Sequence, residues 1–220
     1  EGIGGGRCFQ FLFGLKEAAE VDRMMRQAEL DHLSPHIETL RRAGYTVVLD
    51  RQAYAEDFFA AMEARSQGAE GLQLAGVYWS AHGHPDGSLE CADGSVIGPE
   101  EFEGRPCPAG LRVVVLSACY VASKAKIWER ALGGSALVIG WGEAVSSSRA
   151  VDFLRQREEV DSDFDDLLRK YLLRDDPLPR RADTFEAQCL VASGSFDAYR
   201  EKVEEALSSV GARWESRGDE

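Results

Sequence analysis

Six short apolar runs alternate with stretches of helical periodicity along this chain. The expected strands cover residues 8–13, 45–49, 74–79, 111–116, 135–140 and 188–192. Apolar residues recur at helical spacing over residues 21–43, 56–69, 123–132, 149–173 and 196–209. Strands rich in Val, Leu and Ile that alternate with helices are typical of a mostly parallel sheet with helices on both faces. The sequence therefore predicts a three-layer α/β/α fold with a six-stranded sheet.

Two local features modify this pattern. The pairs Asp86-Gly87 and Asp93-Gly94 flank a short segment, which predicts a small hairpin beside the main sheet. The first helix contains Pro35, so the pattern also allows a break in that helix near Ser34.

The charge of the chain restricts its partners. Its 220 residues fit one domain, and 38 acidic residues against 25 Lys and Arg leave a net charge of −13. A surface of this charge repels the phosphate backbone of nucleic acids and anionic membranes. We therefore expect no nucleic acid and no membrane as partners, and basic proteins or peptides as the more natural ones.

The cysteines point to a reducing compartment. There are five, an odd number without a C-x-x-C pair, which is unlike a disulfide framework or a zinc knuckle. Since no apolar run is long enough to span a membrane, we expect a cytoplasmic protein. The chain begins with Glu1 and not with Met, so a longer parent polypeptide with a neighbouring domain stays open.

Two of the predicted strands end in residues that can do chemistry. One is followed by Ser80-Ala81-His82-Gly83 and the other by Ser117-Ala118-Cys119. Because the carboxyl ends of parallel strands meet at one edge of a sheet, His82 and Cys119 lie close together if these strands are neighbours. An imidazole can take the proton of a thiol, so the pair is a candidate nucleophile and base. The Gly83 N–H, unhindered by a Cβ, could form an oxyanion hole with the Cys119 N–H.

These strand ends resemble the catalytic motifs of the caspase-like cysteine peptidases, which include caspases, metacaspases, separases and bacterial CHAT-domain proteases. The shared pattern is an apolar strand ending Ser-x-His-Gly and, 37 residues after His82 here, an apolar strand ending Ala-Cys. Together with the segment 133–141, it is most similar to the CHAT group. Papain-like enzymes and glutamine amidotransferases place Cys before His in the chain, so the order His82 then Cys119 points away from both classes. Caspases proper carry Gln-Ala-Cys and a Gly-containing turn, whereas Ser117 and Tyr120 stand here, so we expect no aspartate specificity.

The resemblance covers most of the chain and implies a caspase-like fold for residues 1–210, with 211–220 as a flexible tail. It implies a cysteine endopeptidase (a hydrolase) that acts on protein or peptide substrates. Cys119 would attack the peptide carbonyl, His82 would protonate the leaving amine, and water would hydrolyse the acyl-enzyme. It also implies activation by a regulatory partner or a fused sensor module.

The resemblance further places the pocket for the residue before the scissile bond (P1) near residues 16–17, Ser117 and 141–143. Glu143 or Glu17 could pair with a basic P1 side chain, whereas Lys16 would suit an acidic one. Of the two, a basic P1 is favoured. Trp141 could form a wall against the substrate backbone or the P2 side chain.

Other interpretations of these residues remain open. The chain could be a catalytically silent caspase-like scaffold or binding module, or a different α/β hydrolase or transferase with a cysteine nucleophile. We expect neither a metal nor another cofactor, because His84, Cys91 and Cys107 have irregular ligand spacing. Four side chains are interpreted as packing residues: Cys8, Cys91, Cys107 and Cys189. His32 and His36 are interpreted as surface residues of the first helix, and the acidic cluster 158–166 as a solvated helix face or loop.

Overall fold

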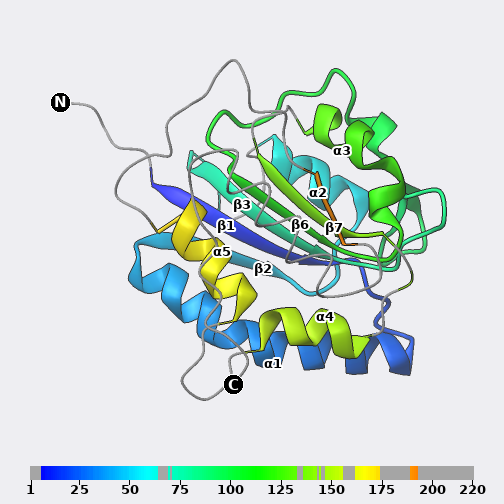
Figure 1. The fold of residues 1–220 in the computed structure, drawn as a ribbon, viewed down its shortest axis with the longest axis horizontal. Coiled ribbons are helices and arrows are strands. Elements are labelled where there is room, and N and C mark those ends of the chain that lie inside the picture. The colour runs from blue at the N-terminus through cyan, green and yellow to red at the C-terminus, as the bar shows by residue number, and fades with distance from the viewer. Residues whose placement is uncertain are drawn as a thin grey trace.

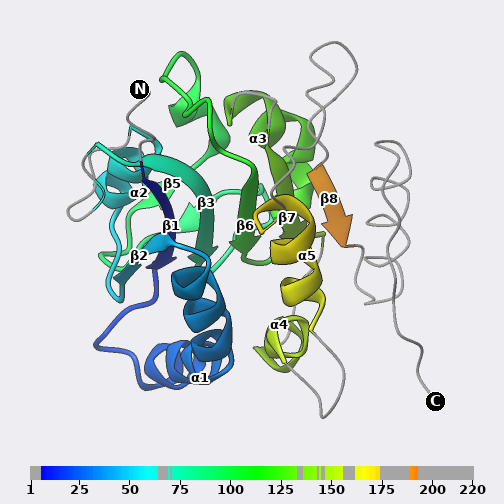
Figure 2. The same cartoon turned by 90° about the vertical axis from the view of Figure 1, so that its left-hand side faces the viewer.

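The computed structural model describes residues 6–63, 69, 71–132, 136–142, 144, 147–155, 162–173 and 189–192. In this part of the chain a six-stranded parallel sheet has the order β2-β1-β3-β6-β7-β8 (Figures 1 and 2). Its strands are β1 (Arg7–Phe13), β2 (Tyr45–Asp50), β3 (Gln73–Ser80), β6 (Val113–Ser117), β7 (Leu137–Trp141) and β8 (Cys189–Ala192). The short strands β4 (Leu89–Glu90) and β5 (Val96–Ile97) pair antiparallel. The expected α/β class, the mostly parallel sheet and the accessory hairpin are confirmed.

Helices cover both faces of this sheet (Figure 1). On one face lie α1 (Glu20–Arg42), α4 (Ser147–Leu154) and α5 (Asp163–Tyr171). On the other lie α2 (Ala55–Met62), α3 (Ala125–Ala131) and the 3₁₀ turns Pro99–Phe102 and Val121–Lys124. Strand β1 has apolar side chains on both of its faces. Phe9, Phe11 and Phe13 face α1, whereas Cys8 and Leu12 face α2.

Helix α1 carries polar side chains on its buried face. It is continuous through Pro35, so the break allowed near Ser34 does not occur. Its buried positions follow the spacing of three or four residues that one face of a helix requires, with His36 and Ile37 as the one adjacent pair. They are Asp22, Arg26, Glu29, Leu33, His36, Ile37 and Leu40. Four of these side chains are ionisable, which is unusual because burying a charge without a partner costs free energy. The partners of these four groups connect α1 to the rest of the fold.

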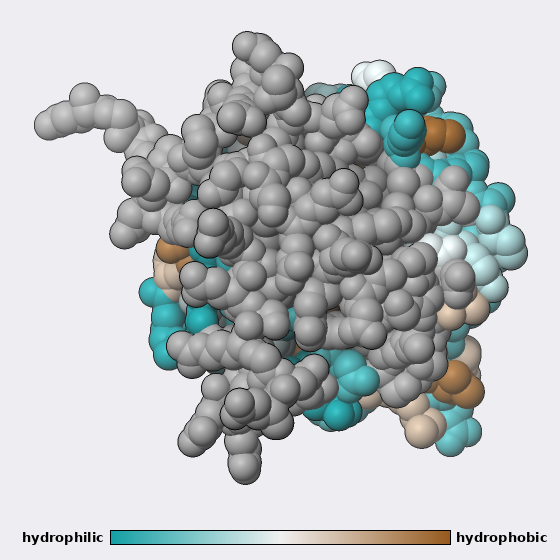
Figure 3. Space-filling model, in the orientation of Figure 1, coloured by the Kyte–Doolittle hydropathy of each residue, from teal (hydrophilic) through white to brown (hydrophobic). Residues whose placement is uncertain are grey.

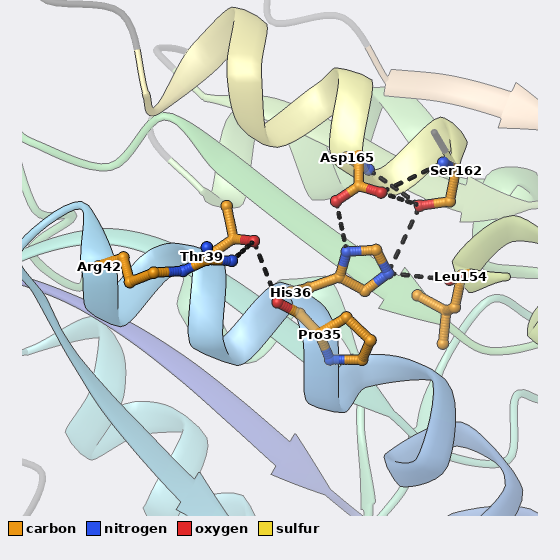
Figure 4. A network of polar contacts seen from close by, with 7 residues as sticks. All are labelled: Pro35, His36, Thr39, Arg42, Leu154, Ser162 and Asp165. Atoms are coloured by element: carbon orange, nitrogen blue, oxygen red, sulfur yellow. Dashed lines mark hydrogen bonds and ion pairs between the residues drawn. The ribbon is translucent and has the colours of Figure 1, made fainter. Parts of the chain in front are cut away.

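His36 of α1 is fully buried and its side chain points toward α4 and α5 (Figure 4). Its Nδ1 lies 2.7 Å from Asp165 Oδ1 and its Nε2 lies 2.8 Å from the Leu154 carbonyl oxygen. The interpretation of His36 as a surface residue was therefore wrong, and so was the solvated position expected for Asp165, which is 3% exposed. The Ser162 Oγ lies 3.4 Å from His36 Nε2, so Ser162, His36 and Asp165 form a Ser-His-Asp group. We assign it a structural role, because all three residues are buried and Nε2 is bonded to the Leu154 carbonyl oxygen.

The single helix predicted over 149–173 is two helices, because Ser162 caps a new one. The Ser162 hydroxyl accepts a hydrogen bond from the Asp165 N–H, and the Asp165 carboxylate accepts one from the Ser162 N–H. This reciprocal pair begins α5. Residues 156–161 between the helices, the predicted helix over 196–209 and the expected tail 211–220 lie outside the described residues.

On the face shown in Figure 3, the coloured residues are mostly hydrophilic, with hydrophobic atoms in small separate patches. The large apolar side chains that remain exposed are Val21, Met24, Leu49, Tyr54 and Val96. Within the described residues, no helix combines the length and the apolar character that a bilayer crossing needs.

Candidate functional site

The two strand ends predicted to carry chemistry are neighbours. Strands β3 and β6 pair in parallel with Ser80 level with Ser117, so His82 and Cys119 each follow this pair by two residues. The contact continues past the strands, where the Ala81 N–H donates to the Ser117 carbonyl oxygen at 3.3 Å. The structure therefore brings the His82 loop and the Cys119 loop together, as expected from the sequence.

Gly83 lies directly against the backbone of Cys119. A Cβ at Gly83 would overlap the carbonyl group and the nitrogen of Cys119, so only glycine fits. Gly83 also faces Leu89 across a short antiparallel bridge in which the flanking residues His82 and His84 make the backbone hydrogen bonds. In such a pair the central N–H points away from the partner strand. The Gly83 N–H is thus directed away from the hairpin.

His82 is held by an acidic residue that the sequence interpretation missed. Its Nε2 lies 2.9 Å from Asp22 Oδ1, near the start of α1, and Asp22 Oδ2 accepts a hydrogen bond from the Lys16 N–H at 2.8 Å. Burial of Asp22 opposes its ionisation, but the hydrogen bonds from His82 and Lys16 outweigh this effect and lower its pKa. Asp22 is therefore a carboxylate at neutral pH. It orients the ring with Nε2–H toward itself and leaves Nδ1 as the basic nitrogen.

Cys119 lies on a sharp turn between β6 and the 3₁₀ turn Val121–Lys124. The next residue, Tyr120, has a φ of 60°, a left-handed backbone conformation that residues other than glycine rarely adopt. Such local strain is concentrated at functional sites. Cys119 is half-buried. Burial raises the pKa of the Cys8 thiol, and it raises the pKa of Cys91 and of Cys107 to about 11. Those three thiols are protonated at neutral pH, in keeping with their interpretation as packing residues; the side chain of Cys189 lies outside the described part.

The predicted P1 residues Ser117 and Trp141 belong to one row of the sheet. The strand register aligns Phe13 with Ser80 and Ser80 with Ser117. Ser117 and Trp141 directly follow the aligned residues Leu116 and Gly140 of β6 and β7. We call these four residues the last row. Phe13 and Trp141 belong to the core on the α1 face, and Ser117 and Trp141 are 8% and 7% exposed.

Of the two glutamates predicted for the same pocket, only Glu17 lies in the described part of the chain. Glu17 pairs with the Arg26 guanidinium and its side chain is 57% exposed. Glu143 lies outside the described residues. Lys16, the residue suited to an acidic P1, is paired with Glu90.

A different glutamate, which sequence reasoning did not single out, contacts the last row. Glu29 of α1 accepts hydrogen bonds from the Ser80 hydroxyl at 2.9 Å and from the Tyr78 hydroxyl at 2.7 Å. The side chain of Ser117 in turn bonds to Tyr78. Burial raises the pKa of Glu29 to about 7, although the two hydroxyls partly offset the effect. The only sequence signal for Asp22 and Glu29 was their spacing of seven residues, which places them on one helical face.

Beside the site, His84 Nε2 lies 3.9 Å from Glu90 Oε2. Among the described residues, no group of three or more His, Cys, Asp and Glu side chains is arranged to hold a metal ion.

Comparison of the sequence with protein-family models and with curated proteins gives no significant match.

Proposed function

We propose that this protein is a caspase-like cysteine endopeptidase that hydrolyses peptide bonds through Cys119 and His82. One observation carries the proposal: the Cys119 turn and the His82-Gly83 loop are in contact, and a buried carboxylate holds the imidazole. A thiol on one loop and an oriented base on the adjoining loop are the two groups that nucleophilic catalysis requires. The resemblance of the two strand-end motifs to those of CHAT-domain proteases supports the same class.

In the proposed reaction, Nδ1 of His82 takes the Cys119 proton and the sulfur attacks the peptide carbonyl carbon. The oxyanion that forms is stabilised by the N–H groups of Gly83 and Cys119. The imidazolium, stabilised by Asp22, then gives its proton to the leaving amine, and a thioester remains on Cys119. Water, deprotonated by His82, attacks the thioester and releases the carboxylate product, which regenerates the thiol.

Regulation of the proposed enzyme follows from the low exposure of the last row. Because Ser117 and Trp141 retain less than a tenth of their surface, a P1 side chain has to displace packed atoms to enter. This favours a resting state that a partner or a fused sensor module converts to an active one.

The test is alkylation of the intact protein with an iodoacetamide probe, followed by mapping of the labelled cysteine. We expect preferential labelling of Cys119 at neutral pH and a strong loss of rate in His82→Ala. Cys107→Ala serves as the matched control, since burial keeps that thiol protonated, and should leave labelling unchanged. Labelling that favours another cysteine, or that is indifferent to His82, would contradict the proposal and favour a silent scaffold.

A further inference from the structure

The hydroxyls of Ser80 and Ser117 lie in the last row, directly before the two proposed catalytic residues. Each serine precedes its catalytic residue by two positions, on the face of the sheet that α1 covers. Ser117 is the residue that the resemblance assigns to the P1 pocket, and Ser80 lies level with it on the neighbouring strand. The groups that lie behind the two serines determine which P1 side chain is stabilised there.

The group behind the serines is the Glu29 carboxyl, which is 3% exposed. It accepts hydrogen bonds from Ser80 and Tyr78, and Tyr78 is also bonded to Ser117. Glu29 thus belongs to one hydrogen-bonded group with both serines of the last row.

No cation of the described residues pairs with Glu29. The nearest basic residue on its own helix, Arg26, is directed elsewhere: its guanidinium contacts Glu17 and the carbonyl oxygens of Leu15 and Arg51. Lys16, at the carboxyl end of β1, is bonded to Glu90. A buried carboxylate without a cation is costly, and such groups are concentrated at functional sites. A cation supplied by the substrate would remove this cost.

We propose that Glu29 determines the specificity of the enzyme by binding the ammonium or guanidinium group of a Lys or Arg at P1, with the Ser80 and Ser117 hydroxyls as further ligands. The inference rests on the proposed peptidase function. It assigns the acidic role to Glu29, which is bonded to Ser80 of the last row, whereas Glu17 is paired with Arg26.

The proton equilibrium of Glu29 supports this assignment. With its pKa raised to about 7 by burial, the carboxyl is partly protonated at neutral pH in the free protein. A cation at P1 favours the carboxylate, so basic substrates should bind better as the pH rises through this range. The ionisable group bonded to Glu29 is Tyr78, which stays neutral, and the nearest buried ionisable residues along α1 are Arg26 and Asp22.

The test compares peptides that differ only at P1, namely Arg, Lys, norleucine, Asp and citrulline, the neutral isostere of Arg. For the wild type we expect kcat/KM for Arg to exceed that for citrulline by about 100-fold, the order of effect of an unpaired buried charge. In Glu29→Gln the ratio should fall to a few-fold, with alkylation of Cys119 unchanged. Glu38→Gln, an exposed site on the same helix, is the matched control and should keep the wild-type ratio.

Thermal unfolding of Glu29→Gln shows whether the variant is folded. A second measurement needs only the wild type: the ratio of kcat/KM for Arg to that for citrulline should rise with pH between 6 and 8, because the effects of Cys119 and His82 cancel in the ratio. A wild type that prefers Asp or norleucine, or a Glu29→Gln variant with an unchanged ratio, would overturn the inference while leaving the peptidase intact. Loss of cleavage together with His82-independent labelling would overturn the proposed function as well.

Discussion

Asp22 connects the backbone after β1 with the imidazole after β3 through the two oxygens of one carboxylate. The Lys16 N–H fixes Oδ2 and His82 Nε2 contacts Oδ1, so the carboxylate has little freedom to turn. A ring held in this way keeps one tautomer and gains stabilisation when it becomes a cation. We regard Asp22 as a positioning residue, since it acts through His82.

Replacing Asp22 with Asn is expected to lower kcat/KM by about 10²–10⁴-fold, because the amide cannot stabilise the imidazolium. The pH profile of Cys119 alkylation should also move to higher pH, since the thiolate–imidazolium pair is less stable. Both quantities can be measured on the same preparation. Asp31→Asn, an exposed site on α1 bonded to Gln27, is the control and should change neither. An unchanged pH profile in Asp22→Asn would reduce Asp22 to a structural role.

Replacing Gly83 with Ala tests the contact between the two loops. The added methyl group overlaps the Cys119 backbone, so we expect the loops to separate, activity to be lost and stability to fall by about 1–3 kcal/mol. Gly98→Ala is the matched control, because there the new Cβ meets only the flexible carboxyl of Glu100. Denaturant unfolding and Cys119 labelling measure the two effects, and near-wild-type labelling in Gly83→Ala would show that the loops tolerate separation.

At the scale of elements, α1 connects three parts of the fold. Its first turn contacts His82 through Asp22, its middle contacts β3 through Glu29, and His36 contacts α4 and α5. In an ordinary amphipathic helix these positions would be apolar. The polar stripe makes the position of α1 on the sheet specific, because a rotation of the helix would separate these groups from their partners and leave the buried partners unpaired.

The His36–Asp165 pair should contribute strongly to the packing of α5 on α1. Removing one partner leaves the other group buried without its partner, so His36→Gln or Asp165→Asn should reduce the free energy of unfolding by about 3–5 kcal/mol. The exposed pair of Glu38 and Arg41 on the same helix is the comparison: Glu38→Ala should cost less than about 1 kcal/mol. Urea unfolding measures both, and equal costs would show that burial adds nothing to the His36 contact.

For the whole molecule, the buried Glu29 makes stability depend on pH. Its pKa in the folded state, about 7, lies above the ordinary 4.5, so the unfolded chain releases this proton first as the pH rises. The contribution of Glu29 to the free energy of unfolding is therefore fully present below pH 4.5 and is lost between pH 4.5 and 7.

Glu29→Gln removes this dependence, and the variant should be the more stable protein at pH 8, by up to about 3 kcal/mol. At pH 4.5 the two proteins should be nearly equal. Denaturant unfolding of both across this range gives the difference at each pH, in which the remaining charges of the −13 chain largely cancel. A variant that is less stable than the wild type at every pH would show that the carboxyl of Glu29 stabilises the folded state.

The secondary structure was largely predictable because its signals are local. The apolar runs located all six strands of the sheet, and the Asp-Gly pairs located the hairpin. The errors have physical causes as well. The helical periodicity continued through 149–173, while the cap at Ser162 that begins α5 depends on a reciprocal bond with Asp165. Strand boundaries also shifted, since β6 and β7 each end at a polar or aromatic residue of the last row.

The sequence by itself determined the α/β architecture and placed His82, Gly83 and Cys119 at the carboxyl ends of two strands. That these strands are neighbours, so that the residues converge, was decided by the tertiary structure. Only the tertiary structure decided which ionisable side chains of α1 face inward. His36 was interpreted as exposed and Asp22 and Glu29 were not singled out, since a charged residue at helical spacing is usually solvated. Their burial depends on partners 49 to 129 positions away along the chain, which no local pattern contains. These distant contacts supply the carboxylates on which the proposed mechanism and specificity rest.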